Sequence, residues 1–190
     1  MRITGGELRG RPLASPKSNA IRPTSDRTRE ALFNIIGNNP DLPEIAGSNV
    51  IDLFAGTGAL GLEALSRGAA NAIFVDQSVD ARGLIRTNIE TLNLEGQARL
   101  MRRDATKLGP ALDRDRVEIA FLDPPYDQGL GERALKALSD GGWLTDGALV
   151  VLEDRKTTKV QLPSGFHEFD IRTYGEAAIH LMHFQPGARS

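Results

Sequence analysis

The sequence predicts an α/β fold built on a parallel β-sheet, and three observations along its 190 residues lead to that class. Short apolar runs alternate with segments of helical period between residues 50 and 152. A glycine-rich turn at residues 56–61 joins the first apolar run to the helical segment after it. Two β-like segments near the C-terminus flank Tyr174-Gly175-Glu176. The alternation favours parallel strands with right-handed crossovers, and the final pair favours an antiparallel hairpin at the sheet edge.

The N-terminal part of the chain predicts a small extension that precedes this sheet. Residues 2–14 are expected to form two short strands around the turn signal Gly5-Gly6, and the proline-containing residues 15–23 a loop. A helix is expected to begin near Thr24-Ser25, because either residue can cap it. Gly37 and the polar residues after it end this helix.

The sheet itself is predicted from short apolar runs, whose β-branched and aromatic residues suit buried strands. These strands are expected at residues 50–54, 72–76, 98–101, 117–122 and 148–152. One helix is expected to open at the turn 56–61 and to run to about residue 67, others at residues 81–92 and 131–139, and a short one after residue 101. The C-terminal hairpin is expected at residues 166–173 and 177–184.

The composition indicates a protein with an ordinary buried core, because 40% of its residues are hydrophobic and 25% are charged. Cysteine is absent, which excludes disulfides, thiolate metal sites and a cysteine nucleophile. The chain has no apolar run of about 18 residues that could span a membrane. Residues 1–11 are polar and basic, unlike a secretory signal sequence. We therefore expect a cytoplasmic protein that makes no membrane contact.

Charge is unevenly distributed along the chain. Residues 1–36 hold seven basic and three acidic side chains, a net charge of +4, whereas the remainder has a net charge of −6. A basic segment on an acidic body is typical of phosphate contacts, and it is equally compatible with a solvated N-terminus. We divide the chain into a basic hairpin with its helix, residues 1–40, and a sheet domain, residues 41–186.

The turn at residues 56–61 matches G-x-G-x-x-G between a predicted strand and a predicted helix. Glycines permit a tight turn and close approach of the backbone to a ligand, and a helix N-terminus favours an anionic group. Asp76 ends the next strand, 20 residues after Gly56, where a carboxylate can hold both ribose hydroxyls of an adenosine. The pattern predicts an adenosine-type cofactor, either a nicotinamide dinucleotide or S-adenosylmethionine.

Asp52 distinguishes between these two cofactors. It lies inside the first predicted strand, and a carboxylate buried there needs a partner. The ammonium group of a methionine moiety is one such partner, whereas a pyrophosphate would be repelled. The segment Asp52-Leu53-Phe54-Ala55-Gly56-Thr57-Gly58 resembles motif I of the class I methyltransferases. Asp104 matches the position at which that family contacts the adenine amino group, although a helix cap is the other interpretation.

The segment Asp123-Pro124-Pro125-Tyr126 follows the fourth predicted strand directly. Ligands of open α/β sheets bind at the carboxyl ends of strands, so this segment is expected to face the glycine turn. The prolines offer no N–H donor, which leaves the Asp123 carboxylate and the Pro124 carbonyl as acceptors beside an aromatic ring. Two acceptors on an exocyclic NH2 group can aim its lone pair at a methyl sulfonium, while Tyr126 stacks on the base. The motif resembles the signature of the amino-methyltransferases of DNA and RNA.

Three N-terminal stretches carry a more specific pattern: Arg2-Ile3-Thr4-Gly5-Gly6, Arg9-Gly10-Arg11 and the run Arg22 to Asn34. Together they resemble the RsmD family of bacterial 16S ribosomal RNA guanine-N2 methyltransferases, and the similarity extends to about residue 184. The resemblance implies a Rossmann-like, seven-stranded class I methyltransferase sheet. It implies methyl transfer from S-adenosylmethionine to a guanine of the small ribosomal subunit, with S-adenosylhomocysteine as product. We expect a monomer.

These patterns define the expected site residues. The expected catalytic residues are Asp123, Pro124 and Tyr126. The expected cofactor-binding residues are Thr24, Asp52, Phe54, Ala55, Gly56, Thr57, Gly58, Asp76, Gln77, Asp104 and Ala105. The expected RNA-binding residues are Arg9, Arg11, Arg22 and Arg27. No metal site is expected, because His180 and His183 lie three apart in a predicted strand and point to opposite faces.

Three other functions stay open at this stage. An adenine-N6 or other amino methyltransferase of DNA or another RNA would use the same chemistry, although the chain leaves little room for a DNA-reading domain. A non-catalytic RNA-binding ribosome-assembly factor is disfavoured because Asp52, Asp76 and Asp123 are intact. A nicotinamide-dependent oxidoreductase would leave the Asp-Pro-Pro-Tyr segment without a role.

Overall fold

The computed structural model describes residues 1–16 and 25–187. Over these residues the strands are β1 (Asn49–Leu53), β2 (Asn71–Val75), β3 (Ala98–Met101), β4 (Val117–Leu122), β5 (Leu144–Arg155), β6 (Phe166–Tyr174) and β7 (Ala177–Phe184). The helices are α1 (Asp26–Asn38), α2 (Ala59–Ser66), α3 (Val79–Leu92), α4 (Leu130–Asp140) and a short 3-10 helix, η1 (Asp113–Asp115). Within this described part of the chain, every helix is too short or too polar to cross a bilayer.

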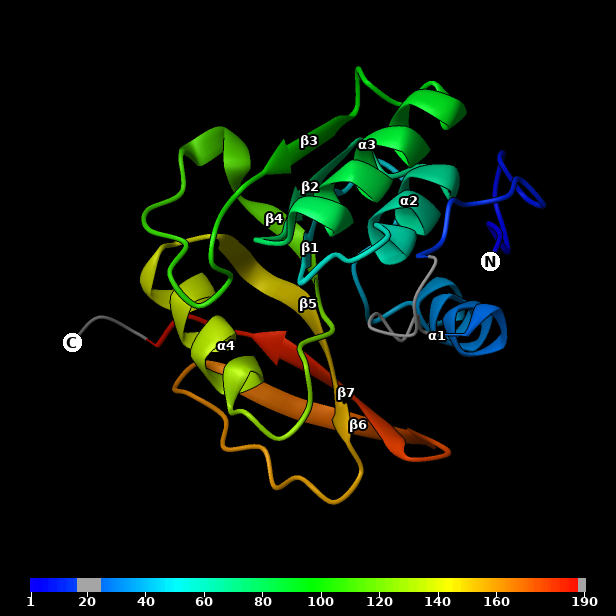
Figure 1. Ribbon diagram of the computed structural model, residues 1–190. Helices are drawn as coiled ribbons and strands as arrows, with labels where there is room; N and C mark the ends of the chain where they lie inside the picture. The colour runs from blue at the N-terminus through cyan, green and yellow to red at the C-terminus, as the bar shows by residue number, and fades with distance from the viewer. Residues whose placement is uncertain (17–24, 188–190) are drawn as a thin grey trace.

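The described strands form one seven-stranded sheet in the order β3-β2-β1-β4-β5-β7-β6. The first five strands in that order are parallel, and β7 runs antiparallel to both β5 and β6. Figure 1 shows β6 and β7 side by side along the edge of the sheet that lies farthest from β3. The predicted α/β class, the parallel strands and the C-terminal edge hairpin are therefore confirmed.

The N-terminal extension differs from the expected pair of strands. Only one antiparallel bridge forms there, between Arg2 and Pro12. The N–H groups of Glu7 and Leu8 donate instead to the carbonyl and hydroxyl of Ser66 at the end of α2, at 2.7 and 2.9 Å. Because these donors bond to a helix end, they cannot extend a ladder between the two N-terminal segments.

The short helix expected after β3 forms only later in the connection, as the 3-10 helix η1, and not directly after the strand. The Asp104 carboxylate accepts hydrogen bonds from the N–H and the hydroxyl of Thr106, at 2.8 and 2.7 Å, and this closes a turn. Gly109, with φ of +69°, and Pro110 follow, and neither suits a helix interior. The next helical element in the chain is η1.

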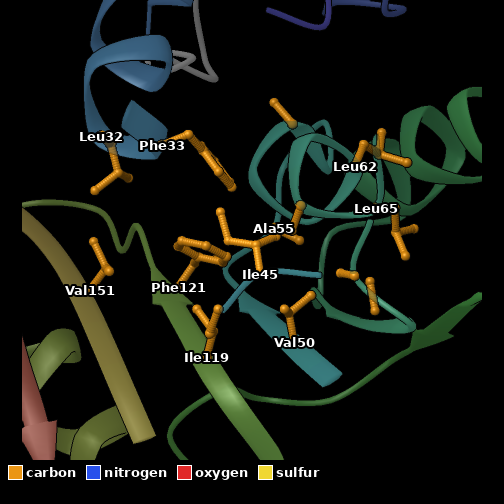
Figure 2. Close-up of a cluster of buried hydrophobic side chains, with 14 of the residues drawn as sticks. Leu32, Phe33, Ile45, Val50, Ala55, Leu62, Leu65, Ile119, Phe121 and Val151 are labelled. Atoms are coloured by element: carbon orange, nitrogen blue, oxygen red, sulfur yellow. The ribbon is translucent and has the colours of Figure 1, made fainter. Parts of the chain in front are cut away.

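Apolar side chains cover both faces of the sheet. Helices α1, α2 and α3 pack on one face, where Phe33 of α1 and Phe121 of β4 have ring centroids 5.4 Å apart. Figure 2 shows this layer, in which Leu62 of α2 lies near the same sheet face. Helix α4 packs on the opposite face through Leu135, in the same cluster as Leu152 of β5. The sheet is thus fixed between two helical layers, which gives its carboxyl edge a rigid support.

A buried ionic cluster fixes the N-terminal extension to the sheet domain. Glu63 of α2 is fully buried, and its carboxylate accepts hydrogen bonds from the N–H and the hydroxyl of Thr4, at 2.9 and 2.7 Å. The same carboxylate contacts Nε of Arg29, at 3.2 Å, and Nε of Arg67, at 2.9 Å. A buried charge is tolerated only when it is paired and hydrogen-bonded in this way. The cluster therefore joins α1 and the N-terminal segment to the helix that follows the glycine turn.

Candidate active site

The carboxyl ends of β1 and β4 bring the two sequence motifs together. These strands are parallel neighbours, with Leu53 paired with Leu122. The glycine turn leaves β1 and the Asp-Pro-Pro-Tyr segment leaves β4 at this same edge of the sheet. Contact continues past the strand ends, because the Asp123 N–H donates to the Leu53 carbonyl at 3.4 Å. The expected proximity of the two motifs is present in the structure.

The glycine turn begins with a strained residue. Phe54 has φ of +58°, in the left-handed region that a side chain disfavours. Such a conformation costs about 1–3 kcal/mol and collects at functional sites. The Ala55 N–H donates to the Val75 carbonyl at 3.2 Å, and the Gly58 N–H returns to the Ala55 carbonyl at 2.7 Å. The turn is therefore attached to β2 and closed on itself before α2 begins.

Two glycines of the motif meet different needs. Gly56 has φ of +58°, and its N–H donates to Oδ2 of Asp76 at 2.9 Å. Gly61 lies inside α2, where an added Cβ atom would come within 2.4 Å of the Phe74 ring. Gly56 is thus required by the shape of the turn, and Gly61 by the close packing of α2 on β2.

Thr57 is buried in the middle of the turn and is supported by residues far away in the sequence. Its hydroxyl donates to the sulfur of Met1 at 3.6 Å, and its carbonyl accepts a hydrogen bond from the Asn88 amide at 2.9 Å. The Asn88 side chain also receives the N–H of Ala14 at 2.7 Å. Sequence analysis missed Met1 and Asn88, because no local pattern marks a contact between such distant residues.

Asp52 is buried in β1 and points at the first turn of α2. Its Oδ2 accepts the N–H of Gly61 at 2.9 Å, which supplies the partner that a buried carboxylate needs. Burial and the negative charge of Asp76 raise the pKa of Asp52 to about 8, against the opposing effect of the Gly61 hydrogen bond. A cation beside this carboxyl would favour its charged form. The ammonium group of a methionine moiety fits that requirement.

Asp76 lies at the end of β2, half-buried, with both oxygens directed by the backbone. Oδ2 accepts the Gly56 N–H at 2.9 Å, and Oδ1 accepts the Ser78 N–H at 2.8 Å. These bonds orient the carboxylate beside the glycine turn, and each oxygen retains further acceptor capacity for ribose hydroxyls. Gln77, the next residue, is exposed at the same edge.

Asp104 follows β3 at the same carboxyl edge as Asp76. The hydrogen bonds from the Thr106 hydroxyl and N–H lower the pKa of Asp104, so this carboxylate is charged near neutral pH. It closes a turn, in place of the helix cap that the sequence had offered as an alternative role. Ala105 is buried directly behind it.

Tyr126 is half-buried in the loop after β4, and β5 holds it. Its hydroxyl donates to Oε1 of Glu153 at 2.6 Å. The guanidinium carbon of Arg155 lies 5.6 Å from the centroid of the tyrosine ring, and Nε of Arg155 contacts Asp127 at 3.0 Å. Pro124, between these groups and Asp123, is buried. The three expected catalytic residues thus lie on one loop that β5 supports.

Glu153 is a site residue that sequence analysis missed. The fifth strand was expected to end at Leu152, whereas β5 continues to Arg155. Glu153 is therefore the first residue beyond the predicted strand, where α/β sheets place their functional side chains. Its position directly after a predicted strand is the sequence feature that could have identified Glu153 as a site residue.

Of the basic residues expected to bind RNA, Arg11 lies far from the carboxyl edge that carries Asp123. Arg11 is exposed, and its guanidinium donates to the carbonyl of Thr91 in the last turn of α3, at 2.8 Å. Crossover helices run antiparallel to their strands, so this helix end lies at the opposite edge of the sheet. Arg9 is exposed in the same N-terminal segment, and Arg27 is exposed in the first turn of α1. Arg22 and Thr24 lie outside the described residues.

His180 and His183 lie on β7, which is separated from β4 by β5. His180 contacts Glu168 through Nδ1 at 2.5 Å, and the ring of His183 stacks on Phe169 with centroids 4.6 Å apart. In residues 1–16 and 25–187, no three His, Cys, Asp or Glu side chains converge as a metal-binding group.

The fold and these two motifs are those of a class I methyltransferase. A solved structure described as the putative methyltransferase yhhF from Escherichia coli superimposes with a TM-score of 0.81 and 35% sequence identity. The match covers 97% of this chain and 98% of that one. The parallel sheet with its antiparallel edge hairpin is therefore a methyltransferase fold, and the chain is an enzyme of this class.

A family model described as "Conserved hypothetical protein 95" matches residues 1–183, and the chain belongs to that family, the RsmD family. Ribosomal RNA small subunit methyltransferase D of Escherichia coli K12 is 42% identical over 153 residues, which cover 80% of this chain and 74% of that protein. The putative rRNA methyltransferase YlbH of Bacillus subtilis is 38% identical over 187 residues, covering 95% and 97% of the two chains. The resemblance seen in the N-terminal motifs is confirmed.

Proposed function

We propose that this enzyme transfers the methyl group of S-adenosylmethionine to the exocyclic N2 amine of a guanine in the RNA of the small ribosomal subunit. One observation carries the proposal. The glycine turn after β1 and the Asp-Pro-Pro-Tyr segment after β4 leave neighbouring parallel strands at the same edge. The name of the Escherichia coli relative, ribosomal RNA small subunit methyltransferase D, supports the choice of substrate.

Three carboxylates along the carboxyl edge suit the three polar parts of the cofactor. Asp52 would face the ammonium group of the methionine moiety, Asp76 the ribose hydroxyls and Asp104 the adenine amino group. When bound, the cofactor supplies a methyl group activated by a sulfonium. The strained turn at Phe54 brings backbone close to the same place, so the site is formed before the ligand arrives.

The Asp-Pro-Pro-Tyr loop would orient the base. The Asp123 carboxylate and the Pro124 carbonyl accept the two hydrogens of the amine, which directs the nitrogen lone pair toward the methyl group. Tyr126 stacks on the base, which must be unpaired or leave its helix. As the nitrogen gains its methyl group, one of its protons becomes acidic and passes to Asp123 and then to solvent. The acceleration of methyl transfer comes from positioning and electrostatics.

The substrate would be the assembled subunit or its RNA, approached by a monomer. Folded RNA is read largely by shape and by its backbone, which suits a small enzyme without a separate recognition domain. The basic residues of the N-terminal extension would contact phosphates outside the immediate site.

The test is transfer of a labelled methyl group from S-adenosylmethionine to small ribosomal subunits that lack their native modifications, followed by nucleoside analysis. We expect a single N2-methylguanosine peak. Asp123→Ala should reduce transfer at least about 100-fold, because the amine loses an acceptor that acts only in the transition state. Asp146→Ala is the matched control, since it removes an exposed carboxylate near the start of β5.

Cofactor binding by calorimetry separates the two roles. Asp123→Ala should bind S-adenosylmethionine with nearly unchanged affinity. Full turnover by this variant would refute the role of Asp123. A methylated adenine, or the absence of transfer with cofactor still bound, would refute the proposed substrate and leave the methyltransferase fold intact.

A further inference from the structure

Glu153 lies on β5, beside the point at which Asp123 follows β4, and the chemistry proposed above does not use Glu153. In the β4/β5 ladder Leu122 pairs with Leu152, so Asp123 and Glu153 are the next residues of two adjacent parallel strands. On its other side, Glu153 pairs with Ile179 of β7. The β7 ladder at Glu153 and the β4 ladder that ends at the preceding residue therefore fix the backbone of Glu153, and with it the place from which its carboxylate projects.

The bond to Tyr126 shows where that carboxylate lies. The tyrosine hydroxyl donates to Oε1 of Glu153 at 2.6 Å, so the carboxylate lies at the rim of the ring on which the base would stack. A stacked base presents its edge, and not its face, to groups at the rim of the ring. The guanidinium carbon of Arg155 lies 5.6 Å from the centroid of the same ring, and Asp127 holds Arg155 there.

We propose that Glu153 selects guanine by accepting a hydrogen bond from its N1–H, while Asp123 and the Pro124 carbonyl hold the N2 amine. This inference rests on the proposed function. In guanine, N1–H and the N2 amine are adjacent donors on one edge, and carboxylates are acceptor-only groups. A carboxylate has about four acceptor positions, so the Tyr126 bond does not prevent a second one.

The same arrangement rejects adenine. The N1 atom of adenine carries a lone pair and no hydrogen. Beside the Glu153 carboxylate it could form no hydrogen bond, and the two groups would repel each other. A site built around a particular donor discriminates strongly against an analogue that lacks it, because its polar group is left unpaired. Glu153 thus supplies, from the structure, the distinction between guanine N2 and adenine N6 that the shared Asp-Pro-Pro-Tyr chemistry does not make.

The test removes the N1–H donor from the base and, separately, replaces the Glu153 carboxylate by an amide that can donate. Subunits are reconstituted with guanosine or 2-aminopurine riboside at the methylated position. 2-Aminopurine keeps the N2 amine, but its N1 is an acceptor. Methyl transfer by the wild type should favour guanosine on the order of 10- to 100-fold in kcat/KM, the range of a good base-edge contact. Glu153→Gln should lose most of that preference, because its amide can donate to N1 of 2-aminopurine.

Tyr126→Phe is the control for an indirect effect. It removes the hydroxyl bonded to Glu153 and keeps both the ring and the carboxylate, so the ratio of guanosine to 2-aminopurine should stay within about threefold of the wild-type ratio. Cofactor affinity and the melting temperature of each variant verify that the site is folded.

The outcomes separate the two proposals. If Glu153→Gln slows both substrates equally and keeps the wild-type ratio, Glu153 only positions Tyr126, and this inference is overturned while the proposed function stands. If the wild type methylates no guanosine of the subunit, the proposed function is wrong and the inference falls with it. Both the proposed function and this inference are supported if the ratio of guanosine to 2-aminopurine methylation collapses in Glu153→Gln and is retained in Tyr126→Phe.

Discussion

At the scale of single residues, Asp52 shows how burial prepares a carboxyl group for a cationic ligand. It is nearly inaccessible to solvent, and its pKa is raised to about 8, mainly by desolvation. At pH 7 the carboxyl is therefore mostly protonated in the unliganded enzyme. An ammonium group arriving beside it would lower that pKa and displace the proton.

We therefore predict that S-adenosylmethionine binding near pH 7 releases a proton from Asp52. Titration calorimetry in two buffers of different ionisation enthalpy should give different binding heats, and the difference should disappear in Asp52→Asn. The raised pKa also affects stability. The folded state holds the proton of Asp52 more tightly than the unfolded state does. The contribution of Asp52 to the free energy of unfolding therefore falls as the pH rises from about 4 to 8. Equal heats in both buffers for the wild type would show that Asp52 does not meet the ammonium group.

At the scale of secondary-structure elements, the contact of α2 with β2 positions the glycine turn. Gly61 allows the helix to approach the Phe74 ring so closely that a Cβ atom at that position would lie 2.4 Å away. Phe74 is fully buried in a close-packed core, so moving its ring aside would disturb its neighbours. The position of α2, and hence of the turn before it, depends on the absence of one methyl group.

Gly61→Ala is therefore expected to lower the free energy of unfolding by about 1–3 kcal/mol, the usual cost of overpacking a core. It should also weaken cofactor binding, because the turn moves with the helix. Gly83→Ala is the matched control: Gly83 lies within α3, where a Cβ atom would contact nothing within 4 Å. That variant should gain roughly 0.5–1 kcal/mol from helix propensity. Chemical denaturation of both variants measures the difference, and a stable Gly61→Ala would show that α2 can shift without cost.

The elements that could be predicted from the sequence are those whose signals are local. Ser25 was a candidate cap, and its side chain accepts the Thr28 N–H at the start of α1. The glycine turn and the Asp-Pro-Pro-Tyr segment are each contiguous in sequence, and the strand before each is mostly apolar. Glu153 escaped prediction because β5 continues beyond its apolar run, which only pairing with β7 reveals. The contact of Arg29 with Glu63 joins residues 34 positions apart, and no periodicity reports it.

At the scale of the whole molecule, the contact of Arg11 lies at the opposite end of the sheet from the proposed site, although Met1 of the same N-terminal segment reaches the glycine turn. Asp123 follows the carboxyl end of β4, whereas Arg11 bonds to the last turn of α3. An RNA that contacts both must extend past α2 and α3, a path longer than one flipped nucleotide. The N-terminal arginines would then contribute affinity without taking part in methyl transfer.

Replacement of Arg9 and Arg11 by alanine should weaken binding of the small subunit or its RNA and reduce the slope of log affinity against log salt by roughly 1 to 2. The rate of methyl transfer at saturating substrate should change little, because both residues lie away from the carboxyl edge. A double variant at Arg114 and Lys136, two exposed cations on η1 and α4, removes the same charge elsewhere. If the two double variants show the same salt slope, the N-terminal arginines make no specific phosphate contact.

The position of β7 between β5 and β6 has a consequence for biosynthesis. A ribosome releases the chain in sequence order, so β6 emerges before the strand that must separate it from β5. Until residues 177–184 are available, β5 is an unprotected edge whose backbone groups and apolar side chains are open to other nascent chains. Folding of this half of the sheet must therefore wait for its last strand, and the interval is when newly made molecules are most exposed to aggregation.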